Sequence, residues 1–191
     1  MPLTTYTAGE VLTAASLNAN LSFAAASPAS GLTLINSTTI SAAGTTSVND
    51  VFSATYDFYK IIFNQTASST LQTLTLRLRV SATDNTTNYT TQRIGSQGGS
   101  AFGGLNESGT DEFFIADINS TKGFFEITVL NPFAAAPTKY SSIALGENGS
   151  GLLNFVMVGA NTNATSFTGF SILASTGTIS GTLKVYGLAN S

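Results

Sequence analysis

The chain of 191 residues contains no cysteine, no histidine and no tryptophan. Disulfide bonds are therefore excluded, and so are Ser-His-Asp and Cys-His catalytic sites and zinc sites of the common type. The absence of cysteine also removes any dependence of folding on the redox conditions inside or outside a cell. These absences predict a protein that is not an enzyme and that holds no cofactor.

Charged residues are also scarce, at 9% of the chain against roughly 25% in an average soluble protein. Seven Lys and Arg against ten Asp and Glu leave a net charge of −3. No basic patch is available to neutralise phosphates, so we expect no nucleic-acid partner. No segment approaches the ~20 apolar residues of a membrane span, so we expect no membrane partner. Residues 1–6 lack the features of a secretory signal, which predicts assembly in the cytoplasm.

Ser, Thr, Asn and Gly take the place that charged residues hold in other proteins. Thr favours strands, whereas Asn and Gly favour tight turns. The alternative is low-complexity disorder. Thirteen Phe and six Tyr within alternating segments favour a folded, β-rich protein.

Residues 1–30 differ from the rest and are predicted to form an anchoring segment and a linker. Thr13 can cap a short helix on which Leu17 and Leu21 share a face. A helix this short is marginal alone in water and needs a surface to lie against. The small residues from Ala24 to Gly31 then indicate a linker. A tail whose helical pattern arises by chance is the alternative.

From Leu32 onward nearly every segment alternates with period two. Leu74, Leu76, Leu78 and Val80 point to one face, and Thr73, Thr75, Arg77 and Arg79 to the other. Strands are predicted around residues 32–40, 59–64, 73–80, 112–118, 125–129, 141–146, 153–158, 167–173 and 182–186. No helical pattern separates them, which excludes βαβ units. We therefore predict that residues 31–191 form one antiparallel β-sandwich, most like a jelly roll.

The acidic residues are the candidates for catalysis, since paired carboxylates suffice for glycoside hydrolysis. They are Glu107, Asp111, Glu112 and Asp117, with Glu126 and Glu147 elsewhere. Asp111 and Glu112 are adjacent ahead of a strand, so we expect their side chains to diverge. A calcium site from Asp111, Asp117 and nearby carbonyls would need only oxygen ligands, but no Asp-rich loop supports it. We predict solvated turn acids, with neither a catalytic pair nor a metal site.

Residues 95–104 are the most glycine-dense stretch of the chain. They lack the Gly-Lys-Ser/Thr ending of a phosphate-binding loop and lead into no helix. One interpretation is a mobile loop that presents Gln97, Phe102 and Asn106 to a receptor. The other is a long flexible connection without a ligand. Arg77 and Arg79, on one outer face, suit a subunit contact, a hydrated face or a grip on a carboxylate.

Three short segments carry a family resemblance. Residues 6–18, YTAGEVLTAASLN, resemble the N-terminal segment of many tailed-bacteriophage virion proteins, particularly fibre-like ones. Residues 180–187, SGTLKVYG, look like the last strand of β-rich phage structural proteins. Residues 56–62, YDFYKII, are similar to a strand in such proteins, including those of cyanophages and other marine phages.

The resemblance implies an N-terminal peg held by the virion, a β domain exposed outside it, and a homotrimer. In that arrangement Val11, Leu12, Leu17 and Leu21 would anchor the chain to tail, portal-vertex or capsid proteins. No short internal repeat encodes the shaft of a typical tail fibre. We therefore expect an appendage that binds a host-surface glycan or protein. The alternative is a capsid decoration, cement or head-fibre protein without a ligand.

Overall fold

The computed structural model describes residues 8–9, 13–15, 18, 31–97, 100–118, 122–148 and 151–189. The predicted anchor residues Val11, Leu12, Leu17 and Leu21 lie outside these ranges. Within them, no helix has the length and apolar character that crossing a membrane requires.

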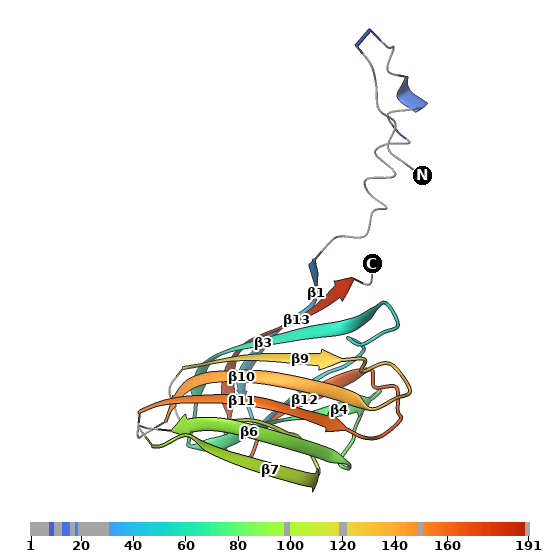
Figure 1. Cartoon of the computed structure of the whole chain (residues 1–191). Coiled ribbons are helices and arrows are strands. Elements are labelled where there is room, and N and C mark those ends of the chain that lie inside the picture. The colour runs from blue at the N-terminus through green and yellow to red at the C-terminus, as the bar shows by residue number, and fades with distance from the viewer. Residues whose placement is uncertain are drawn as a thin grey trace.

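Two antiparallel β-sheets make up most of the described chain, which confirms the predicted all-β class. The strands are β1 (Leu32–Ala43), β2 (Thr45–Val48), β3 (Tyr56–Ser68), β4 (Gln72–Val80), β5 (Thr83–Asp84), β6 (Tyr89–Gln97), β7 (Gly103–Thr110), β8 (Phe113–Ile118), β9 (Gly123–Leu130), β10 (Thr138–Asn148), β11 (Gly151–Asn161), β12 (Gly169–Ala174) and β13 (Ile179–Ala189). Eight strands form one sheet, in the order β1-β13-β3-β9-β10-β11-β6-β7 (Figure 1). Five form the other, ordered β2-β12-β4-β5, with β8 also paired to β4. The sheets lie face to face in a sandwich-like arrangement.

The strand pairs are nested along the chain. β1 pairs with β13, β2 with β12, β3 with β9, and β4 with β8. β13 also pairs with β3, and β12 with β4, which joins these pairs into the two sheets. β10, β11, β6 and β7 are inserted inside this nest and all extend the same sheet. The eight-stranded sheet is therefore wider than the sheet that it faces.

All nine strands predicted from the alternation are present, and the structure adds β2, β5, β6 and β7. Leu74, Leu76 and Leu78 are buried as predicted. Val80 was expected on the same buried face, but it is 42% exposed. It is the last residue of β4, where the chain turns back into β5, so the opposite sheet no longer covers it.

Aromatic rings fill the space between the sheets. Phe63 and Phe125, neighbours in the larger sheet, stack with their ring centroids 5.7 Å apart. Phe113 of β8 meets the Tyr89 ring of β6 edge-on at 4.6 Å and stacks on Tyr140 of β10 at 3.8 Å. Because Phe113 belongs to one sheet and its two partners to the other, this cluster holds β6 over β8.

The Tyr89 hydroxyl replaces a missing strand neighbour of β4. The pairing of β4 with β8 ends at Leu76 and Phe113, two residues before Leu78. The Leu78 amide instead donates to the Tyr89 hydroxyl at 2.9 Å, and that hydroxyl donates to the Asn85 carbonyl at 3.0 Å. Burial raises the pKa of Tyr89 to about 12, because a phenolate would be poorly solvated there.

We predict that Tyr89→Phe lowers the free energy of unfolding by about 1–3 kcal/mol, because the buried Leu78 amide loses its acceptor. Tyr186→Phe is the control, since within the described ranges the Tyr186 hydroxyl forms no hydrogen bond. Its effect should stay within about 0.5 kcal/mol. Urea unfolding followed by circular dichroism measures both values, and equal losses would contradict this role of Tyr89.

Candidate functional site

The candidate site lies where the larger sheet extends past the edge of the smaller one. β8 is the edge strand here, and it contacts β10, β11 and β6 of the opposite sheet. β7 pairs with β6 and forms the outer edge of the larger sheet. From Arg93 onward the inward-facing side chains of the β6–β7 hairpin therefore line a cleft, whereas Tyr89 and Thr91 are buried.

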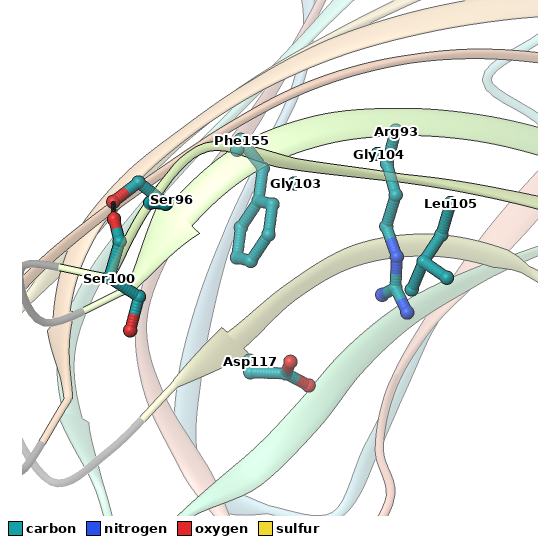
Figure 2. A pocket seen from close by; sticks show the side chains of 10 residues that line it. Arg93, Ser96, Ser100, Gly103, Gly104, Leu105, Asp117 and Phe155 are labelled. Carbon is teal, nitrogen blue, oxygen red and sulfur yellow. Dashed lines mark hydrogen bonds between the residues drawn. The ribbon is translucent and has the colours of Figure 1, made fainter.

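The cleft consists of two adjoining hollows that share Arg93 and Asp117. The first has a volume of about 310 Å³ and also contains Leu105 and Phe155. The second has a volume of about 290 Å³ and is lined by Thr73, Thr75, Arg93, Glu107, Thr110, Asp111, Glu112, Phe114 and Asp117. Figure 2 shows Arg93, Leu105 and Phe155 projecting from the larger sheet toward the strand that carries Asp117.

Arg93 is held in the cleft by an aromatic ring and a carboxylate. Its guanidinium carbon lies 3.8 Å from the centre of the Phe114 ring, within the range of a cation–π interaction. Arg93 Nη2 lies 3.5 Å from Glu107 Oε1 on β7. Phe155 meets Phe114 edge-on with the ring centroids 5.5 Å apart. The cleft therefore combines two apolar rings with a positioned cation.

Gly95 provides the room for Phe155. The two residues are cross-strand partners on β6 and β11. A Cβ atom at position 95 would overlap both the Phe155 ring and the Asn154 carbonyl oxygen. Only glycine lets the ring lie across β6 and form a wall of the cleft.

Arg77 draws the neighbouring acids together. Its Nη2 atom contacts the Asp111 carboxylate and lies 3.1 Å from Glu112 Oε2. The prediction that Asp111 and Glu112 diverge is therefore wrong, because one guanidinium from β4 attracts both carboxylates. Asp117 accepts a hydrogen bond from Thr73 Oγ1 at 2.8 Å. The structure thus places four carboxylates, those of Glu107, Asp111, Glu112 and Asp117, around one cleft.

The fold alters the titration of Glu112. Its partial burial raises its pKa above the usual value of 4.5, because the charged form loses solvation. The Arg77 charge and a hydrogen bond with Thr75 oppose this rise, and the charge of Asp111 adds to it. Glu112 therefore titrates at higher pH than an exposed glutamate does.

The glycine-dense stretch forms a β-hairpin rather than a long loop. Gln97 is the last residue of β6, and β7 begins at Gly103. Phe102 lies in the connection and is 69% exposed. Asn106 is an exposed β7 residue on the face away from the cleft, where it lines a separate hollow of about 280 Å³ with Gln92 and Lys139. The three residues share one hairpin, and their contact with a receptor stays a prediction.

Arg79 is less accessible than the sequence suggested. It is 7% exposed, and its guanidinium contacts Asp84 and donates to Ser171 Oγ at 2.7 Å and Ser47 Oγ at 2.9 Å. The prediction that Arg79 lies on a hydrated face is therefore wrong, because neighbouring strands cover its side chain. The subunit contact suggested for Arg77 and Arg79 stays a prediction.

In the described part of the chain, no group of three or more Asp or Glu side chains could hold a metal ion. Asp111 contacts Arg77 and Asp117 bonds with Thr73, so the two residues of the suggested calcium site are engaged by side chains of the same chain.

Sequence reasoning missed the residues that shape the cleft, among them Leu105, Phe114 and Phe155. The strand β6 carries only a weak alternation signal. Its inward positions are Tyr89, Thr91, Arg93 and Gly95, and most of these residues are not apolar. Nothing local in the sequence indicates that this strand pairs with β11, some 60 residues later.

Comparisons of the chain with protein-family models, with curated proteins and with solved structures gave no match.

We predict that the stability supplied by Glu112 falls as the pH rises. Because the pKa is raised in the folded state, the contribution is complete below the usual value of 4.5 and is lost as the pH rises through the raised pKa of the folded state. The difference in unfolding free energy between the wild type and Glu112→Gln should therefore decrease between pH 4 and pH 8, as measured by urea titration. An increase would mean that the attraction of Arg77 outweighs burial.

Proposed function

We propose that the chain is a non-enzymatic structural protein of a bacteriophage virion, an appendage that attaches by its N-terminus and binds a host-surface glycan in the cleft. The observation that carries this proposal is the position of the cleft relative to the start of the sandwich. The chain enters the sandwich through β1, at one edge of the eight-stranded sheet, whereas β6 and β7 lie at the other edge (Figure 1). Seven spacings between strands separate these edges by on the order of 30 Å. A protein held at one edge presents the other outward.

We further propose that the sandwich is a jelly roll. A jelly roll is an antiparallel ribbon of paired strands, rolled so that successive pairs lie in alternate sheets. The nested pairs β1–β13, β2–β12, β3–β9 and β4–β8 alternate between the two sheets in this way. In this description β10, β11, β6 and β7 are additional strands that extend one sheet of the jelly roll.

The chemistry of the cleft favours a neutral glycan. Carboxylates and threonine hydroxyls can exchange hydrogen bonds with sugar hydroxyls, and the exposed Leu105 side chain beside the edge of Phe155 offers an apolar surface. Four acids around the cleft outnumber Arg77 and Arg93, which disfavours an acidic sugar. The affinity of a single site of this kind is weak, and several copies on one particle would multiply it.

The proposal that the protein is not an enzyme rests on the ion pairs and hydrogen bonds of the four acids. Glu107 pairs with Arg93, Asp111 and Glu112 pair with Arg77, and Asp117 accepts from Thr73. Hydrolysis of a glycosidic bond needs one protonated and one ionised carboxyl facing the same bond. Carboxylates engaged in ion pairs and hydrogen bonds of this kind suit ligand binding.

The alternative is a capsid decoration or head-fibre protein that coats the head without a ligand. The apolar outer face of the eight-stranded sheet favours it, because such a face could lie against a capsid. Either role places the protein on the virion after assembly in the host cytoplasm, as a homotrimer among tail, portal-vertex or capsid proteins.

We predict that Gly103→Phe reduces glycan binding about tenfold or more by filling the cleft. A Cβ atom at position 103 would meet open space, and this residue is the β7 partner of Gly95 on the inner face. Ser108→Phe is the control on the same strand, because Ser108 is exposed on the opposite face and lines neither hollow. An array of neutral oligosaccharides measures binding of the full chain and both variants. Equal binding by both variants would contradict the cleft as the site, and release of shortened oligosaccharides would contradict the non-enzymatic role.

We predict that Leu17→Asp with Leu21→Asp abolishes incorporation into particles, because it charges the apolar face of the proposed anchor. The control is Ala15→Asp with Ala19→Asp, which has the same spacing on the opposite face of a helix. Quantitative mass spectrometry of purified particles gives the copy number, and circular dichroism checks that the sandwich still folds. Normal incorporation of the leucine variant would overturn the anchor.

A further inference from the structure

The outer faces of the two sheets differ in polarity. An antiparallel sheet that faces water normally directs polar side chains outward. The alternate positions of β4 in the smaller sheet are polar, with Thr73 and Arg77 partly exposed and Thr75 buried. Most of the large apolar side chains that are exposed in the described ranges lie instead on the outer face of the eight-stranded sheet. The larger sheet is therefore the one whose outer face calls for a covering partner.

Six of these side chains form one continuous surface, which we call the apolar patch: Ile94, Phe124, Ile143, Leu145, Val156 and Val158. Cross-strand pairing connects β6, β11, β10 and β9 through it, since Val156 lies opposite both Ile94 and Ile143 and Leu145 lies opposite Phe124. Each of the six is between 40% and 54% exposed. A contiguous patch of this kind marks an interaction surface.

The size of the apolar patch matches one side of a subunit interface. The six side chains expose on the order of 600 Å², at the upper end of what a monomeric protein shows. A standard interface buries about 800 Å² on each partner, of which somewhat more than half is apolar. The patch alone can therefore supply the apolar part of such an interface.

The charges around the apolar patch fit a second copy of this chain. Lys139 and Glu147 lie on the same outer face near opposite ends of β10, with Ile143 and Leu145 between them. Glu126, the cross-strand partner of Ile143, is neutralised by Lys60 Nζ at 2.8 Å. Because the edge of the apolar patch carries both positive and negative charges, it disfavours a strongly acidic or strongly basic partner. A second copy of this chain carries the same mixture of both signs around its own apolar patch.

We propose that copies of this chain associate through the apolar patch, so that the outer face of the eight-stranded sheet is the subunit interface. The expected number of three copies rests on the proposed function. The choice of this face as the interface rests on the exposed residues of the apolar patch. This places the subunit contact on the sheet opposite to Arg77 and Arg79.

The first test is the mass of the full chain in solution by light scattering. We expect the wild type at three times the chain mass of 19.7 kDa, and Ile143→Lys with Val156→Lys at the mass of one chain. Leu71→Lys, at an exposed apolar residue outside the patch, and Arg77→Ala, on the other sheet, should keep the wild-type mass. Thermal unfolding checks that each variant is folded, and Ile143→Thr with Val156→Thr is a milder pair that keeps β-branched side chains.

A second test uses the absence of cysteine from the natural chain. Val156→Cys introduces one thiol into the apolar patch, and Leu71→Cys introduces one outside it. Under mild oxidation we expect a disulfide-linked pair of chains from Val156→Cys and none from Leu71→Cys at the same concentration. This measurement leaves the wild-type charge pattern of the face unchanged.

A monomeric wild type, or an oligomer that persists in both patch variants, would overturn the proposal. Dissociation by Arg77→Ala alone would also overturn it and would return the contact to the smaller sheet. A dimer that the patch variants dissociate would support the face and contradict only the trimer of the proposed function. Incorporation into particles is measured separately, so failure of the virion assignment is distinguishable from failure of this interface.

Discussion

The unequal width of the two sheets is the constraint on which the rest of the structure depends. Four nested strand pairs could close into two sheets of equal width, but β10, β11, β6 and β7 are all added to one of them. The aromatic cluster of Phe113, Tyr89 and Tyr140 ties this wider sheet to the edge strand β8. Beyond that cluster the hairpin of β6 and β7 extends past the smaller sheet, and its inner face becomes the wall of a cleft.

The scarcity of charge gives this arrangement its chemical character. Because charged residues make up only 9% of the chain, the gathering of Arg77, Arg93 and four acids concentrates charge around one cleft. The outer face of the larger sheet is distinct in the opposite sense, since its centre is apolar. The proposed functions follow this division: the cleft takes a ligand, the apolar face takes a neighbouring copy, and the edge at β1 leads to the anchor.

Alternation predicts strands well where one face enters the core, and poorly where it does not. In β4, Leu74, Leu76 and Leu78 pack inward, so the sequence predicts that strand directly. In β6 and β7 the inward positions are held by residues such as Arg93, Gly95 and Glu107, because these strands line the cleft. Polar residues and glycine at these inward positions form the candidate site, and they also interrupt the apolar alternation from which a strand is predicted. The meeting of Asp111 and Glu112 at Arg77 was equally hidden, because it depends on the packing of β4 beside β8.

The central claim is that this sandwich is displayed on a virion by its N-terminal segment. Immunogold electron microscopy of intact phage particles, with an antibody raised against residues 31–191, tests it most directly. The account predicts gold label concentrated at the tail. Label spread over the head would support the decoration role in place of the appendage, and particles without label would contradict the virion assignment itself.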